Sequence, residues 1–149
     1  MSSISKKIRL LIADDQPVIL RGLSIIIGSE TDIEVVGLAN DGAEAVQLAI
    51  ELCPDVIIMD LHMPNLSGVE AIRNIMLHNA EIKIIVLTTI AESELISNAI
   101  RSGAHTYLLK DAAEQDILKT IRSALPSNSS GANEILCQNS QQPNDAEVL

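Results

Sequence analysis

Five short apolar runs alternate with longer segments of helical periodicity, and this alternation constrains the fold more than any other feature of the sequence. The runs are IRLLIA (8–13), EVVGL (34–38), VIIMD (56–60), KIIVLT (83–88) and TYLL (106–109). Three of them are nearly continuous in Val, Ile and Leu, as expected of strands that are buried on both faces of a parallel sheet. The pattern therefore predicts five strands covered by helices on both faces.

The segments that follow these runs carry apolar residues at helical spacing. The clearest stripe consists of Ile117, Leu118, Ile121 and Leu125. Pro17 suits a first helical position, and Asp41 with Glu44 has the spacing of a capping box. With short connections and right-handed crossovers, the chain is predicted to be an α/β protein, a doubly wound (βα)5 sandwich of three layers. The common flavodoxin-like strand order 2-1-3-4-5 is expected for its sheet.

The composition changes after Leu125. Of the 24 residues from Pro126 onward, eleven are Ser, Asn or Gln, which is typical of a flexible linker. We therefore expect one domain over residues 1–125 and a linker over 126–149.

The chain has 20 acidic against 10 basic residues, giving a formal net charge of -10. A surface of this charge repels nucleic acid and anionic membranes, so this chain alone is not expected to bind either. No stretch approaches the roughly 20 apolar residues that span a bilayer. A cytoplasmic location is expected.

Three carboxylates follow or end two of the predicted strands: Asp14 and Asp15 after the first, and Asp60 at the end of the third. If these strands are neighbours, the three side chains converge where ligands bind in doubly wound sheets. Two unit charges about 4 Å apart repel by roughly 4 kcal/mol at an effective dielectric near 20. A proton or a cation must relieve this repulsion, and oxygen ligands at an open sheet edge suit Mg²⁺ or Mn²⁺.

Thr88 and Lys110 are predicted to lie on the same rim, because they end the fourth and fifth strands. A hydroxyl and an ammonium group beside a divalent cation can neutralise the equatorial oxygens of a transferring phosphoryl group. One carboxylate is then free to act as the nucleophile. Asp60 is the better candidate, since the adjacent Asp14 and Asp15 are placed to hold the ion.

Four motifs together resemble the CheY-like receiver domain of bacterial two-component response regulators. They are ADD (13–15), DLHMPNLSG (60–68), LTT (87–89) and GAHTYLLKD (103–111), within a match that covers residues 7–125. The resemblance implies that Asp60 accepts a phosphoryl group from a phosphohistidine of a sensor histidine kinase, and that Asp14, Asp15, Asp60 and the His62 backbone carbonyl bind Mg²⁺. It further implies that Thr88 and Lys110 contact the phosphoryl group, and that Tyr107 turns inward behind Thr88 as the domain switches. Such a domain is a phosphoacceptor switch that catalyses its own phosphorylation and dephosphorylation, rather than a metabolic enzyme.

The segments ANDGAEAVQLA and GAHTYLLKDA are similar to those of the NarL/FixJ subfamily, whose members are transcription regulators with a C-terminal helix-turn-helix. The final residues, QPNDAEVL, resemble the opening of that output domain, so 126–149 is expected to run into a helix-turn-helix that the chain otherwise lacks. DNA would then be a partner only through that missing domain, and a homodimer is a further expected partner. Ile90 stands where a polar residue is frequent in fast-hydrolysing members, which predicts slow loss of phosphate.

Other functions stay open on the sequence. A stand-alone receiver without an output domain is the alternative to a transcription regulator. A phosphatase of the haloacid dehalogenase type also uses an aspartate nucleophile at a strand end, but it needs a second Asp where His62 stands. A flavodoxin-type flavin binder would need a phosphate-cradling loop where Asp14, Asp15 and Pro17 lie. Individually, Asp15 could instead cap a helix, Thr88 and Lys110 could be ordinary strand-end residues, and Tyr107 could be packing.

Overall fold

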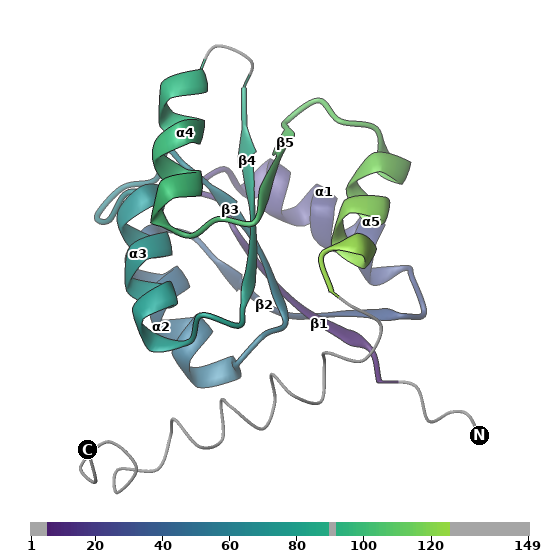
Figure 1. The fold of residues 1–149 in the computed structure, drawn as a ribbon. Helices are drawn as coiled ribbons and strands as arrows, with labels where there is room; N and C mark the ends of the chain where they lie inside the picture. Colours follow the sequence, from purple (N-terminus) through teal and green to yellow (C-terminus); the bar gives the residue numbers. More distant parts are fainter. Residues whose placement is uncertain (1–5, 90–91, 126–149) are drawn as a thin grey trace, which may run out of the picture.

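Strands and helices alternate five times along the chain (Figure 1). The structure, a computed structural model, describes residues 6–89 and 92–125. Its elements are β1 (Ile8–Ala13), α1 (Pro17–Gly28), β2 (Ile33–Ala39), α2 (Gly42–Leu52), β3 (Val56–Asp60), α3 (Gly68–His78), β4 (Lys83–Thr88), α4 (Ser93–Ser102), β5 (Thr106–Leu109) and α5 (Glu114–Ser123). All five predicted strands are confirmed, and β2 is one residue longer at each end than the prediction.

The five strands form one parallel sheet in the order β2-β1-β3-β4-β5, which confirms the predicted topology. The chain moves outward from β1 in both directions, so the strand order reverses between β1 and β3. Ala13 at the end of β1 pairs with Met59, and Asp60 at the end of β3 pairs with Leu87. The residues that follow β1 therefore lie beside the end of β3, at the position where doubly wound sheets bind ligands.

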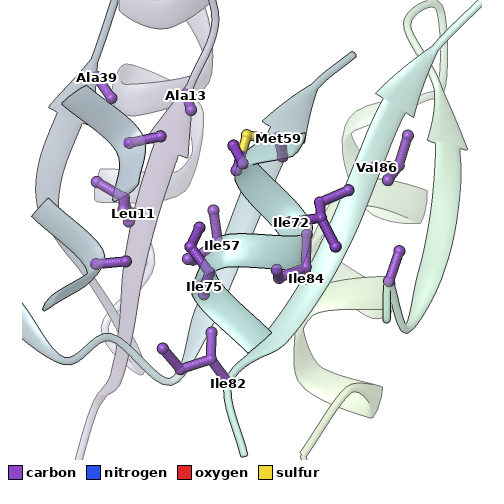
Figure 2. Close-up of a cluster of buried hydrophobic side chains, with 14 of the residues drawn as sticks. Leu11, Ala13, Ala39, Ile57, Met59, Ile72, Ile75, Ile82, Ile84 and Val86 are labelled. Atoms are coloured by element: carbon purple, nitrogen blue, oxygen red, sulfur yellow. The ribbon is translucent and has the colours of Figure 1, made fainter. Parts of the chain in front are cut away.

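Each face of the sheet has its own apolar core. Leu11, Ile57 and Ile84 point to the side covered by α2, α3 and α4, where Ile72 and Ile75 of α3 meet them (Figure 2). Their neighbours along the strands point to the opposite side, where α1 and α5 pack. Because both faces are covered, every residue of β3 is buried, which explains the continuous apolar runs in the sequence.

The predicted helix starts are confirmed at α1 and α2. Pro17 is the first residue of α1, where its missing N–H has no intrahelical partner to lose. The Asp41 side chain accepts a hydrogen bond of 2.8 Å from the Glu44 backbone N–H. The return contact of the capping box is shifted by one residue, since Glu44 Oε1 accepts from the N–H of Asn40 rather than from that of Asp41.

The apolar stripes are wider than the buried faces. Val18 on α1 is 82% exposed, although it lies in the helix that supplies the buried Leu20, Leu23 and Ile27. In the described part of the chain, no helix has the length and apolar character needed to cross a membrane. The predicted linker at 126–149, the output-domain likeness of its last residues, and Ile90 lie outside the described residues.

Candidate phosphoacceptor and metal site

The three predicted carboxylates converge at the carboxyl edge of the sheet. Asp14 and Asp15 follow β1, Asp60 is the last residue of β3, and one oxygen from each lies within 4.8 Å of the others. Asp14 is fully buried and Asp60 is 1% exposed, whereas Asp15 is exposed. The cluster therefore has two carboxylates enclosed by protein and one at the solvent boundary.

Lys110 reaches this cluster from the residue after β5. Its Nζ lies 3.2 Å from Asp60 Oδ1 and 3.8 Å from Asp14 Oδ2. The ammonium thus lies between the two buried carboxylates, although it comes from the edge strand of the sheet. The predicted convergence of residues from β1, β3 and β5 is present in the structure.

The electrostatics of the cluster favour protonation or a cation. Burial raises the pKa of Asp14, and the neighbouring Asp60 raises it further, against the opposing effect of the Gln16 N–H, which donates to Asp14 Oδ1 at 2.8 Å. Burial likewise raises the pKa of Asp60, against the lowering effect of Lys110. One ammonium for three carboxylates leaves a net negative charge in a site mostly removed from water.

The donor set fits a hard divalent cation. Asp14 Oδ2 and both Asp60 oxygens accept no hydrogen bond of good geometry from a described residue. Lys110 comes near them as an ion pair, and the His62 backbone N–H is close enough to Asp60 to lower its pKa. Buried acceptors without donors are costly, so this arrangement points to a ligand that supplies positive charge. All the side-chain donors are carboxylate oxygens, which suits Mg²⁺ or Mn²⁺ better than a softer metal.

Thr88 lies at the end of β4 and is 1% exposed. Its hydroxyl donates a hydrogen bond of 2.8 Å to Glu92 Oε1. The other oxygen of Glu92 lies 2.5 Å from Nε2 of His62. Sequence reasoning placed Thr88 on the rim but missed Glu92, because nothing in the spacing of an acidic residue four positions later indicates a contact across a loop.

Tyr107 and His62 lie at the surface of the described structure. Tyr107, in β5, is 48% exposed, and the His62 side chain is 62% exposed. An exposure of 48% fits both alternatives for Tyr107, the half-buried packing residue and the switch residue. The alternative that Asp15 caps α1 fails, because the cap position is Gln16 and no side chain caps that helix.

The loop between β3 and α3 is held close to Asp60 by Gly68. A β-carbon on Gly68 would lie 2.5 Å from the Asp60 carbonyl oxygen and 2.6 Å from Leu61 Cα, which only glycine avoids. The Gly68 N–H donates to the Leu61 carbonyl. Asn65, in the same loop, donates from its side chain to Asp41 Oδ2 at 2.8 Å and so ties this loop to the start of α2.

The described residues thus define a doubly wound α/β domain with an acidic, lysine-containing site at its topological switch point. The response regulator receiver domain family matches residues 10–122 of the chain. The chain belongs to this family, the receivers of two-component signal transduction, and the resemblance predicted from its motifs is confirmed.

The sequence relatives are transcription regulators. The chain is 43% identical over 117 residues to the transcriptional regulatory protein LiaR of Bacillus subtilis (strain 168), covering 78% of this chain and 56% of LiaR. It is 43% identical over 118 residues to the uncharacterized transcriptional regulatory protein YxjL of the same organism, covering 79% and 54%. The chain therefore spans about half the length of the curated relatives it matches.

Solved structures agree in fold. The signal receiver domain of the putative response regulator NarL from Mycobacterium tuberculosis matches with a TM-score of 0.76 and 27% identity, over 79% of this chain and 95% of that one. The response regulator domain of Thermotoga maritima CheB matches with a TM-score of 0.73 and 38% identity, over 80% and 96%. The predicted similarity to NarL-type receivers is confirmed at the level of the domain.

Proposed function

We propose that this domain is a phosphoacceptor switch in which Asp60 takes a phosphoryl group from a phosphohistidine of a sensor histidine kinase in a Mg²⁺-dependent reaction. One observation carries the proposal: the buried Asp60 carboxylate has an oxygen, Oδ2, without a hydrogen-bond donor among the described residues, next to Asp14 and Lys110. An anionic nucleophile that is buried, unsolvated and flanked by a cation is suited to attack a phosphorus atom.

In the proposed step an Asp60 carboxylate oxygen forms a bond to phosphorus while the bond from phosphorus to the histidine nitrogen breaks. The electron pair of the broken bond stays on the ring nitrogen. A ring protonated on its other nitrogen leaves as neutral imidazole, and an unprotonated ring becomes neutral by taking a proton from water. A divalent cation held by Asp14, Asp15, Asp60 and the His62 carbonyl would supply positive charge against the phosphoryl oxygens. Lys110 is already within ion-pair distance of Asp60, so it can move with little displacement onto an oxygen of the transferred group.

Thr88 and Tyr107 are the proposed switch residues. The Thr88 hydroxyl donates to a phosphoryl oxygen once Asp60 is modified, and Tyr107 turns inward from its exposed position into the space behind Thr88. This is a two-state element biased by a local change of charge. Through it, the phosphorylated domain controls a transcription output whose DNA-binding part is not among the described residues. A cytoplasmic location, a sensor kinase partner and homodimer formation belong to the same proposal.

The test is incubation with acetyl phosphate and Mg²⁺ followed by intact-mass measurement. We expect about one phosphoryl group per chain, stable in acid and released by hydroxylamine, and no uptake by Asp60→Asn or in the presence of EDTA. Asp111→Asn is the matched control, because it removes an exposed carboxylate beside Lys110 and should label like the wild type. Undiminished labelling of Asp60→Asn would refute the proposal, and sustained release of phosphate would indicate a phosphatase instead.

A further inference from the structure

The Thr88 hydroxyl donates its hydrogen to a residue other than the proposed phosphoacceptor. Its single hydrogen is donated to Glu92 Oε1 at 2.8 Å, although Thr88 ends the strand next to the one that carries Asp60. A hydroxyl group has one donor, so the same hydrogen cannot be given at once to Glu92 and to a phosphoryl oxygen. Formation of the proposed contact with phosphate therefore requires the hydrogen bond to Glu92 to break.

Glu92 is itself held in place from its other oxygen. Glu92 Oε2 lies 2.5 Å from His62 Nε2, and His62 is two residues beyond Asp60. A carboxylate with a partner at each oxygen is better oriented than one with a single contact, because rotation about its side chain breaks both. The hydrogen bond from Thr88, and secondarily the one with His62, lower the pKa of Glu92, in agreement with these two contacts.

The Glu92 side chain has no part in capping the helix that it precedes. It occupies the cap position of α4, but it makes no side-chain hydrogen bond to the helix backbone. Loss of this carboxylate therefore removes the contacts to Thr88 and His62 without removing a helix cap. The closest described contacts of its two oxygens are with Thr88 and His62, and Thr89 next to Thr88 also hydrogen-bonds to this carboxylate.

We infer that Glu92 is a positioning residue that holds the Thr88 hydroxyl away from Asp60 in the unphosphorylated domain, with His62 fixing Glu92 in place. The inference rests on the proposed function. Only those molecules whose Thr88 hydroxyl has left Glu92 can bind a phosphoryl group with this contact. The apparent affinity for the phosphoryl group is therefore reduced by the fraction of molecules in that state. Glu92 thus sets the equilibrium between the resting conformation and the conformation that binds the phosphoryl group.

The test measures binding of beryllofluoride, a phosphoryl mimic, with Mg²⁺ by titration calorimetry. We expect Glu92→Ala to tighten binding about threefold to tenfold, the range of the net contribution of one ordinary hydrogen bond. Glu92→Gln should tighten it less, since the amide retains a carbonyl oxygen for Thr88. Glu94→Ala is the matched control, because it removes an exposed carboxylate from the first turn of the same helix without touching Thr88.

A double-mutant cycle separates positioning from a general structural effect. In a Thr88→Val background the hydroxyl is gone, so Glu92→Ala should no longer change beryllofluoride affinity. An effect of equal size in both backgrounds, or identical affinities for Glu92→Ala, Glu94→Ala and the wild type, would overturn the inference while leaving the proposed function in place. Failure of the wild type to take up phosphoryl from acetyl phosphate would overturn both.

Discussion

The Lys110 ammonium lies 3.2 Å from Asp60 Oδ1 and 3.8 Å from Asp14 Oδ2, between the two buried carboxylates of the cluster. It neutralises one charge of three. The resting site is therefore a region of stored electrostatic repulsion, and stability and function oppose each other there. Proteins commonly retain such destabilising sites because the reaction needs them.

Asp14→Asn should make the metal-free domain more stable. The variant removes one buried negative charge but keeps an oxygen that can accept the Gln16 N–H. We expect the free energy of unfolding in EDTA at pH 7 to rise by roughly 0.5–2 kcal/mol, as for other relieved functional sites. Urea denaturation measures this change, with the exposed Asp111→Asn as the control.

Added Mg²⁺ should make the wild type more stable than Asp14→Asn, the reverse of the order expected in EDTA. A ligand that binds only the folded state stabilises it in proportion to the logarithm of its concentration over the dissociation constant, so the wild type gains stability and Asp14→Asn does not. A variant that is less stable than the wild type in EDTA, or that responds equally to Mg²⁺, would contradict this account of the cluster.

Tyr107 should become less accessible to solvent when the site is occupied. The chain has no Trp and no Phe, so its tyrosine fluorescence reports on this residue alone. From its present exposure of 48% we expect acrylamide quenching to fall when beryllofluoride and Mg²⁺ are added. Asp60→Asn should show no change, and unaltered quenching in the wild type would argue against the inward movement.

Gly68→Ala should disturb the loop that follows Asp60, the proposed phosphoacceptor. The added β-carbon would meet the Asp60 carbonyl oxygen and Leu61 Cα at distances below any ordinary contact. Overpacking of this kind typically costs about 1–3 kcal/mol of unfolding free energy, and we expect weaker phosphoryl uptake as well. Gly22→Ala is the control, because a β-carbon there meets nothing within 4 Å and should stabilise α1 by about 0.5–1 kcal/mol. Equal effects of the two substitutions would refute the steric explanation.

The ion pair between Arg122 and Asp32 should make the free energy of unfolding depend on pH in the acid range. Arg122, in α5, donates two hydrogen bonds of 2.8 Å to Asp32, and this lowers the pKa of Asp32. The folded pKa lies below the unfolded value, so the contribution is complete above about pH 4 and is lost as the pH falls through the lowered pKa. Arg122→Ala should cost roughly 0.2–1 kcal/mol at pH 7, because both partners are substantially exposed.

This difference between Arg122→Ala and the wild type should shrink toward zero below that pH range in a series of urea denaturation curves. Lys119→Ala, an exposed change on the same helix, should follow the wild type throughout. A constant difference at every pH would mean that Arg122 acts through packing of its stem instead of through Asp32.

The strands and the acidic cluster could be predicted because their signals are local. Burial on both faces leaves continuous apolar runs, as in β3, and the position of Asp14 and Asp60 at strand ends determines their meeting once the strand order is known. The contact of Thr88 with Glu92 depends instead on the path of a loop. The contact of Arg122 with Asp32 joins residues 90 positions apart, so no sequence window contains it. The exposure of Val18 could not be predicted either, since the sequence of a helix does not show whether another element covers a given apolar residue.

The same Arg122 has a geometric consequence for communication within the chain. It fastens the last turn of α5 to Glu30 and Asp32, which precede β2, at the amino edge of the sheet. The polypeptide therefore continues past residue 125 from the end of the domain opposite to Asp60. Since a five-residue strand is about 17 Å long, a conformational change that starts at the proposed phosphoacceptor would have to cross the full depth of the sheet to reach residue 125.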